Sequence, residues 1–257
     1  MNRRVLLSLT AATVFAITGA LVSSLGPAGS VVKATTNSKC QGLPNEAALK
    51  AFLVAAPSTG GTAGGLFNGT RMWGAVVNRN SELCTFATST ADPTQVWPGS
   101  QAIAKAKAYT ANAFSNDSLA LSTALLYTFT QPGHSLWSLG QSNLFNPALL
   151  APPSGNAGGK ELIAGGLIFF GGGVPLYDGG GNIVGGLGIS GDTSCTDHEI
   201  AKRVRTLAGL NNVPGGPSAD DITYSSVDGA SVFTHPLCPN TWRNGSLIGT
   251  EAPAAGY

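Results

Sequence analysis

The middle of the chain carries the clearest hydrophobic pattern, two short apolar runs on either side of a glycine-rich turn. The runs at residues 167–170 and 183–189 are rich in β-branched and aromatic side chains, as strands are. The turn at residues 178–181 reads Asp-Gly-Gly-Gly, and hairpin turns need the positive φ that glycine adopts without steric cost. This pattern predicts a central β-hairpin.

Glycine also recurs within and beside these runs, where it weakens a strand because it has no side chain to pack. The repetition predicts a close approach by another group, and two alternatives stay open. Either a helix packs flat on a glycine-lined sheet, or the glycines form a shelf for a flat ligand. The glycines assigned to such a shelf are Gly171, Gly172, Gly173, Gly188 and Gly191.

Other periodic segments predict a second hairpin and four helices. The hairpin joins residues 72–79 to residues 83–88, and continuous apolar residues in its first strand predict burial on both faces. Helical patterns occupy residues 43–56, residues 101–114, residues 119–130, and a segment that follows residues 192–196 and ends at Gly209. In the last helix Thr196 and Glu199 fit a capping box. His198 falls opposite its buried stripe, so we expect it to face solvent or a partner chain.

One lysine lies beside the apolar stripe of the helix at residues 101–114. The stripe consists of Ile103, Ala106, Thr110, Ala113 and Phe114, and at 100° per residue Lys107 falls at its edge. Two interpretations stay open. The stem can pack while the ammonium reaches water, or the ammonium can face an anionic ligand group in a pocket. In the second case, Lys107 and Thr110 line a ligand site against the glycines of the central hairpin.

The first 34 residues resemble an export signal. Two arginines near Met1 precede an apolar run at residues 5–22, and Val32-Lys-Ala34 fits a small-residue cleavage site. The run is about long enough to span a bilayer, so an uncleaved anchor is the alternative. Cleavage would leave a mature chain that begins near Thr35, secreted or periplasmic and free of the membrane.

Composition narrows the class of protein. The chain has 257 residues, enough for one domain with a real core. Charged residues make up 11% and the net charge is +1, so we expect no nucleic-acid partner.

All four cysteines follow the predicted signal, and an even number outside the cytosol favours two disulfides. Of three possible connectivities, loop closure and position favour Cys40–Cys84 and Cys195–Cys238. A metal site is the alternative, although C-x-x-C spacing is absent from the sequence.

The sequence has none of the motifs that would name an enzyme. It lacks H-E-x-x-H, G-x-S-x-G and C-x-x-C-H segments. The G-x-G-x-x-G match at residues 186–191 follows a hairpin strand, whereas a Rossmann fold places this motif in its first βαβ turn. Residue types alone therefore indicate an exported α+β domain with two disulfides and a glycine-lined surface.

Three ordered segments together resemble the GlcG/HbpS-like family, which also occurs as a domain of PduO. Lys107-Ala-Tyr-Thr-Ala-Asn-Ala-Phe114 is similar to the family's K-A-x-T-A-x-x-F helix. Gly171-Gly-Gly-Val-Pro175, followed by Asp178-Gly179, is similar to its G-G-x-P…D-G turn. Residues 184–191, followed by Asp197, are similar to its V-G-x-x-G-V-S-G…D segment. The resemblance covers most of residues 43–210.

The resemblance implies an α+β fold with helices flanking an antiparallel central sheet, in a profilin-like or PAS-like arrangement. Residues 35–210 would form the family domain, and residues 211–257 an extended tail pinned by a disulfide. Family members tend to form homo-oligomers, and several bind haem. We therefore expect an exported haem-binding or haem-handling accessory protein. The alternatives are an oxidoreductase-type enzyme acting on haem or a small metabolite, and a ligand-free structural or sensory oligomer.

The family motifs supply no haem-iron ligand. Haem iron accepts His or Tyr, and the candidates are His134, His235, Tyr109 and Tyr177. For each of them, a loop position or a packed aromatic ring is the alternative. Lys107 would pair with a haem propionate.

Overall fold

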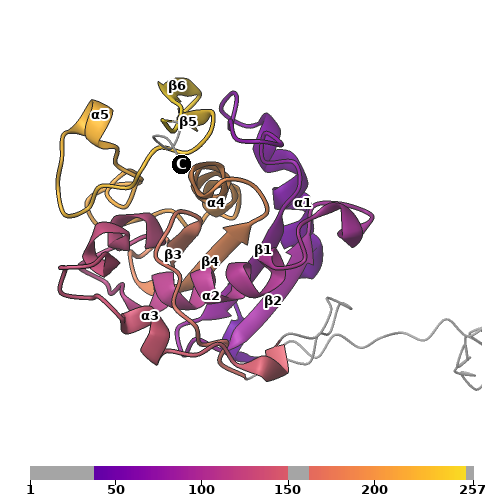
Figure 1. The fold of residues 1–257 in the computed structure, drawn as a ribbon. Helices are drawn as coiled ribbons and strands as arrows, with labels where there is room; N and C mark the ends of the chain where they lie inside the picture. Colours follow the sequence, from indigo (N-terminus) through magenta and orange to yellow (C-terminus); the bar gives the residue numbers. More distant parts are fainter. Residues whose placement is uncertain (1–37, 150–161, 253–257) are drawn as a thin grey trace, which may run out of the picture. The chain divides into compact units, whose positions relative to one another are not determined.

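A four-stranded antiparallel sheet forms the centre of the molecule (Figure 1). The computed structural model describes residues 38–149 and 162–252, all within one compact unit, and the predicted signal lies outside the described residues. The strands are β1 (Trp73–Asn78), β2 (Leu83–Thr88), β3 (Gly173–Tyr177) and β4 (Ile183–Ser190). Their order is β2-β1-β4-β3, and each neighbouring pair is antiparallel. The predicted α+β class is confirmed.

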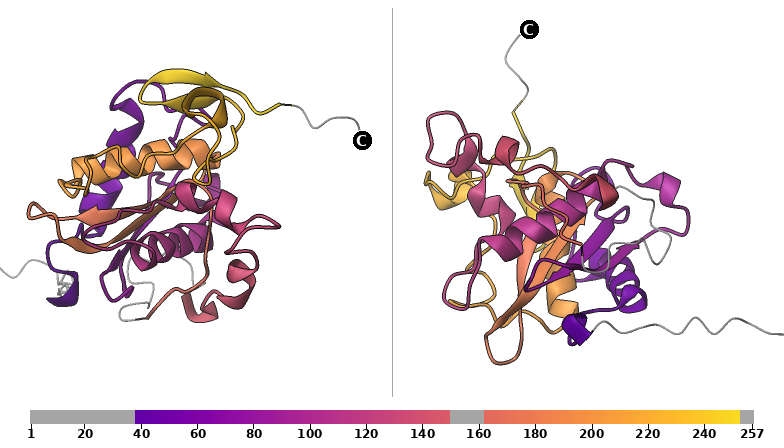
Figure 2. Two further views of the ribbon diagram at one scale, coloured as in Figure 1. Left: turned by 90° about the vertical axis from the view of Figure 1, so that its left-hand side faces the viewer. Right: turned by 90° about the horizontal axis from the view of Figure 1, so that it is seen from below.

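Helices cover both faces of this sheet (Figure 2). On one face lie α1 (Glu46–Ala55) and α4 (Ser194–Leu207). Their apolar side chains pack against Val76 of β1 and against Leu187 and Ile189 of β4; they are Leu49, Leu53, Ile200 and Val204. On the other face lies α2 (Ser100–Ala113), whose Ala104 and Ala108 pack with Trp73, Ala75 and Val77. The strand β1 is buried along its whole length because both faces are covered, as its continuous apolar run predicted.

The central hairpin exists, but its first strand is not the predicted one. Strand β3 spans Gly173–Tyr177 and pairs with β4, whereas residues 167–170 form no strand. Those apolar residues instead run along α2, where Phe169 meets Phe114 edge to face and Ile168 N donates to Thr110 Oγ1. Pro175 is tolerated in β3 because this strand is at the edge of the sheet.

The predicted helix at residues 119–130 is also wrong. This segment forms two 3-10 turns, η4 (Thr123–Leu126) and η5 (Thr128–Thr130). The hydroxyl of Thr123 donates to Phe170 O and accepts from Gly173 N, so it ties the segment to the start of β3. Side-chain bonds of this kind compete with helical continuation.

The predicted helix after residues 192–196 corresponds to α4, but its cap is one turn earlier than expected. Thr193 is the N-cap residue, and its side chain accepts from Thr196 N. Thr196 itself lies inside the helix, with its hydroxyl on Ala63 O. The capping box of Thr196 with Glu199 is therefore wrong. Gly209 follows the helix end with a φ of 69°, the left-handed conformation that favours glycine.

The segment after Leu210 is more structured than an extended tail. It contains α5 (Ser225–Asp228) and a separate hairpin of β5 (Thr241–Arg243) and β6 (Ser246–Gly249). The short elements elsewhere are η1 (Ser38–Cys40), η2 (Ala56–Ser58), η3 (Pro93–Gln95), α3 (Leu139–Ser142) and η6 (Pro147–Leu149).

Two disulfides join the predicted partners, Cys40 to Cys84 and Cys195 to Cys238. The second links the start of α4 to the C-terminal segment, which lies over that helix (Figure 2). Within the described residues, no helix combines the length and the apolar character that crossing a bilayer requires.

Candidate functional site

The three glycines that precede and begin β3 form a junction between elements far apart in the sequence. Gly171 N donates to His235 Nε2, Gly172 O accepts from Ile189 N, and Gly173 N donates to Thr123 Oγ1. We call residues 171–173 the glycine junction. It brings the C-terminal segment, β4 and η4 to the same place, beside the middle of α2 and the first turn of α4.

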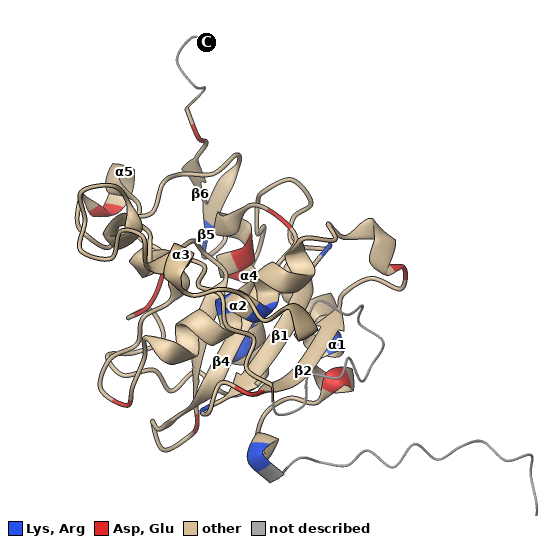
Figure 3. Cartoon of the chain, turned by 60° about the horizontal axis from the view of Figure 1, so that its bottom comes forward, with Lys and Arg blue, Asp and Glu red and all other residues tan. Residues whose placement is uncertain are grey.

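Lys107 of α2 and Asp197 of α4 form a buried ion pair at the glycine junction. Lys107 Nζ lies 2.7 Å from Asp197 Oδ2 and donates to Ile189 O at 3.0 Å. Both side chains are at most 3% exposed. Figure 3 shows basic positions on α2 and acidic ones on α4 in an otherwise sparsely charged ribbon. Because the ammonium does not reach water, the snorkelling interpretation of Lys107 is wrong.

Burial shifts both members of this pair toward their neutral forms. It raises the pKa of Asp197 to about 6, although the Lys107 charge opposes that shift. It also lowers the pKa of Lys107, against the favourable effect of Asp197. Asp197 Oδ1 still accepts from Asp192 N, and the centre of the Phe170 ring lies 4.9 Å from the ammonium. The pair is thus held by several contacts in a site without bulk water.

The glycines of β4 allow α2 to lie directly on the sheet. A Cβ at Gly188 would overlap Ala104 O, and one at Gly186 would overlap Ala108 O. A Cβ at Gly191 would overlap Arg71 O. These contacts support the helix-packing alternative. A ligand role for Gly188 and Gly191 would require these backbones to separate, and it stays a prediction.

Two other predicted site residues, Thr110 and Gly172, have close partners within the protein. Thr110 is buried, with its hydroxyl on Ala106 O and accepting from Ile168 N. A Cβ at Gly172 would lie 2.6 Å from Lys107 Nζ and 2.9 Å from Asp197 Cβ. Only a glycine at position 172 therefore leaves room for the ion pair beside its backbone.

The four candidates for haem-iron ligand differ in accessibility. His134 is exposed and Tyr109 half-buried. Tyr177 is buried, donates to Asn116 O, and has its pKa raised to about 12, mainly by burial. His235 is buried too, with Nε2 bonded to Gly171 N and Nδ1 2.7 Å from Pro236 O. Its burial lowers its pKa to about 4.

His198 is fully buried, so its predicted exposure is wrong. The periodicity of α4 correctly placed it opposite Ile200, but the C-terminal segment covers that face as well. His198 Nε2 lies 3.4 Å from Asp221 Oδ1, and neither ring nitrogen has a hydrogen-bond partner in the described part of the chain. The residue pattern of α4 could not predict this burial, because the residues that cover His198 follow position 210.

Sequence reasoning also missed the role of Asp197 as the partner of Lys107. The aspartate was part of a family-like motif, but its position near a helix start offered a capping role instead. The available signal was the joint presence of a lysine and an aspartate in two family-like motifs. Their contact depends on the packing of two elements 90 residues apart.

Comparison with known proteins gives the following similarities. The family model described as "Haem degrading protein HbpS-like" matches residues 63–205. A search of curated proteins found no match. A solved PduOC–haem complex is 21% identical, with 65% of this chain and 94% of that chain covered and a TM-score of 0.45. The HbpS structure is 20% identical, with 72% of this chain and 98% of that chain covered and a TM-score of 0.40. The Klebsiella pneumoniae protein ORFY is 19% identical, with 63% of this chain and 83% of that chain covered and a TM-score of 0.41.

Proposed function

This chain belongs to the HbpS-like family, and from that membership we propose that it binds haem as an exported haem-handling accessory protein. The supporting observation is the family match over residues 63–205, more than half of the chain. The matched region includes the four-stranded sheet, α2, the glycine junction and most of α4. The haem complex recorded for the PduOC structure belongs to that protein.

A haem-binding site needs an iron ligand that the cofactor can reach and an apolar surface for the ring. His134 meets the first requirement because its imidazole is exposed. Trp137, whose backbone N–H donates to His134 O, is 52% exposed and offers an aromatic face nearby. We therefore assign His134 as the first iron ligand to test, with the half-buried Tyr109 as the second. Bound haem would supply an iron centre able to take part in redox chemistry.

The glycine junction is the second location to consider. Lys107, Thr110, Gly171, Gly172, Gly173, Gly188 and Gly191 would line the ring there. The ammonium of Lys107 already has Asp197 as its partner, so a propionate would have to replace that carboxylate. The backbone of Gly188 also lies directly against Ala104 O, so a ring at Gly188 would require α2 to separate from β4. We therefore place the junction second.

Haem titration of the purified mature chain, followed by the Soret band, tests this proposal. His134→Ala should weaken binding and change the band, whereas His235→Gln should leave both unchanged. Thr110→Val tests the junction, because it removes a hydroxyl and keeps the shape of the side chain. Absence of a saturable Soret change in the folded wild-type chain would refute haem binding. Loss of binding in Thr110→Val but not in His134→Ala would move the site to the junction.

The family description favours one enzymatic alternative, the oxidative breakdown of haem. In that case haem would be the substrate. Incubation of the haem-loaded chain with oxygen and a reductant should then bleach the Soret band and yield a ring-opened product. A stable Soret band through many hours of this treatment would leave binding without turnover.

Export and self-association complete the proposal. Two disulfides are compatible with an oxidising compartment. We expect the exported chain to lack residues 1 to about 34, which its intact mass would show. We also expect a homo-oligomer, to be measured by light scattering. A mass that includes residues 5–22 would indicate a membrane anchor instead.

A further inference from the structure

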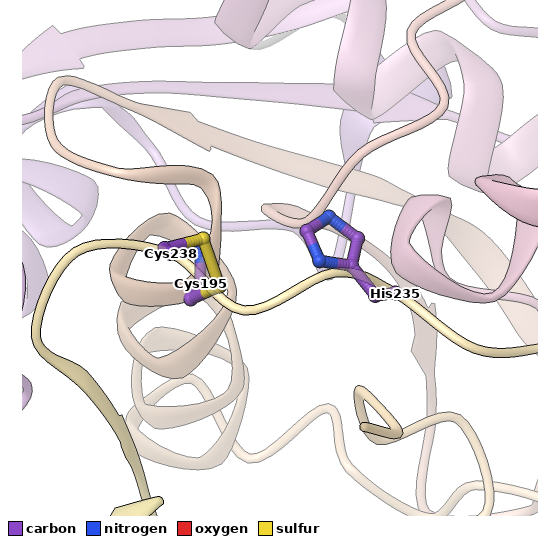
Figure 4. A group of neighbouring side chains, drawn as sticks. All are labelled: Cys195, His235 and Cys238. Atoms are coloured by element: carbon purple, nitrogen blue, oxygen red, sulfur yellow. A yellow bond between two sulfur atoms is a disulfide. The ribbon is translucent and has the colours of Figure 1, made fainter. Parts of the chain in front are cut away.

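A cluster of metal-ligating side chains lies between α4 and the C-terminal segment, away from His134. The sulfurs of Cys195 and Cys238 and a ring nitrogen of His235 all lie within 4.8 Å of one another. Figure 4 shows the His235 ring beside the disulfide that joins the two cysteines. Cys195 and His235 are at most 2% exposed and Cys238 is 6% exposed. Elsewhere in the described ranges, no other group of three such residues comes this close.

A fourth buried side chain, His198, lies near His235 but outside the group of three whose ligand atoms come within 4.8 Å of one another, so its ring would have to move closer to join them. His198 is 0% exposed, and neither of its ring nitrogens makes a hydrogen bond within the described residues. A Cβ at Gly171 would lie 3.0 Å from His198 Cβ, and Gly171 N donates to His235, so both histidines adjoin the same glycine. In this part of the described chain, His198 Nε2 has only Asp221 Oδ1 at 3.4 Å, and His198 Nδ1 has no hydrogen-bond partner. An imidazole buried in this way is costly, which suggests that another species can satisfy Nδ1.

The spacing of the four residues is also typical of metal sites. The chain has Cys195-x-x-His198 at the start of α4 and His235-x-x-Cys238 in the C-terminal segment. Residues three apart lie on the same side of a helix, so Cys195 and His198 project from one face of α4. Two such pairs have the ligand types of a Cys2His2 zinc site. At His235 the metal would have to replace either Gly171 N or Pro236 O as the partner of one ring nitrogen.

We propose that reduction of the Cys195–Cys238 disulfide converts this cluster into a Cys2His2 site for zinc or a similar thiophilic divalent cation. The disulfide and the metal are alternative occupants because a thiolate can coordinate a metal only when it is not bonded to the other sulfur. Two thiolates balance the charge of a divalent cation, so the loaded site is neutral overall. That neutrality suits a cluster buried from water.

An external thiol can reduce the Cys195–Cys238 disulfide. Two small thiols transfer two electrons to the disulfide, are themselves oxidised to one disulfide, and leave two protein thiols. Zinc then binds both sulfurs and releases the two thiol protons. Exchange with a small disulfide reverses the step: the small disulfide takes up two electrons and two protons to give two small thiols, the Cys195–Cys238 bond re-forms, and the metal is released.

One carboxylate is placed to support the site. Asp221 Oδ1 lies 3.4 Å from His198 Nε2 and can accept the proton of that nitrogen, which leaves Nδ1 for the metal. Lys202 contacts the other oxygen of Asp221 at 2.6 Å and holds the carboxylate in place. This order of carboxylate, imidazole and metal is common in zinc proteins.

The full mature chain, reduced with a trialkylphosphine and titrated with Co²⁺ and then Zn²⁺, tests the proposal. We expect one Co²⁺ per chain, with sulfur-to-cobalt charge-transfer absorption that zinc displaces. The oxidised chain should show none. Cys195→Ser with Cys238→Ser should abolish the absorption, and His198→Gln or His235→Gln should weaken binding. Asp221→Asn should weaken it by about 10–100-fold.

The other disulfide supplies a matched control. Cys40→Ser with Cys84→Ser also removes a disulfide but leaves the cluster intact, so cobalt binding after reduction should be unchanged. Circular dichroism shows whether each reduced variant is folded. The proposal fails if the reduced, folded wild-type chain binds no cobalt, if it stays unfolded with the metal present, or if the Cys195/Cys238 variant binds cobalt equally well. Unchanged affinity in His198→Gln would refute the four-ligand site.

Discussion

Lys107 Nζ and Asp197 Oδ2 meet at 2.7 Å although their helices lie on opposite faces of the sheet. The two side chains lie beside the backbone of Gly172, where a Cβ would overlap both of them. Two segments that resemble family motifs thus meet in one ion pair, and the third motif provides the glycine beside it. The arrangement links α2 to α4 at the end of β4.

Removal of one partner of this pair should destabilise the fold strongly. Lys107→Met or Asp197→Asn leaves the other group buried without its partner, and we expect each to cost about 3–5 kcal/mol. The double variant should cost less than the sum of the two, because no charge is then stranded. Urea unfolding of all three variants measures this coupling. Additive costs would contradict the ion pair.

Packing of α2 on β4 predicts a severe effect of even one methyl group at Gly188. The new Cβ would overlap Ala104 O, and overpacking of this kind typically costs about 1–3 kcal/mol. The measurement is thermal unfolding of Gly188→Ala, for which we expect a loss of roughly 2–4 °C per kcal/mol.

Gly179→Ala is the matched control for that substitution. No atom lies within 4 Å of a Cβ at Gly179, so its Tm should stay close to that of the wild type. A Gly188→Ala protein as stable as this control would mean that α2 does not lie directly on β4.

The buried His235 predicts a loss of stability in mild acid. Its pKa falls from 6.5 to about 4 on folding, mainly because of burial, so the unfolded chain takes up the proton first as the pH decreases. The stability due to neutral His235 is present above pH 6.5 and is lost between pH 6.5 and 4, by about 3 kcal/mol at most.

The comparison of wild type with His235→Gln isolates this effect. Glutamine can still accept from Gly171 N but does not titrate. Asp197, whose pKa rises to about 6 mainly through burial, acts in the opposite direction, since its stabilisation is present at low pH and is lost as the pH rises through 6. That contribution is common to both proteins and cancels in the difference. An identical pH dependence of unfolding in the two proteins would contradict the prediction.

The two disulfides should stabilise the chain to similar extents. They close loops with sequence separations of 44 and 43 residues, and each is expected to contribute about 2–4 kcal/mol. Denaturant unfolding of the Cys40/Cys84 and Cys195/Cys238 double serine variants measures both. Hydrogen exchange should rise across residues 211–252 only in the second variant. Equal protection of that segment in both variants would show that the disulfide does not hold it on α4.

The sequence by itself determined the local elements whose pattern is strong. The hairpin of β1 and β2, the extents of α1 and α2, and the pairing of the cysteines all follow from runs, turns and spacing that neighbouring residues define. The family-like motifs also predicted the antiparallel sheet with flanking helices. These features depend on local periodicity, which a single sequence records.

Only the tertiary structure decided the conformation of residues 167–170 and the burial of Lys107 and His198. The apolar run at residues 167–170 suited a strand, but α2 offered it a packing surface, and residues 173–177 took the sheet edge. Lys107 stood at the edge of its stripe, and its burial depended on an aspartate 90 residues away. His198 was predicted to be exposed from its own helix, yet the C-terminal segment covers it. Burial and pairing depend on elements distant in sequence, and periodicity within one element cannot record them.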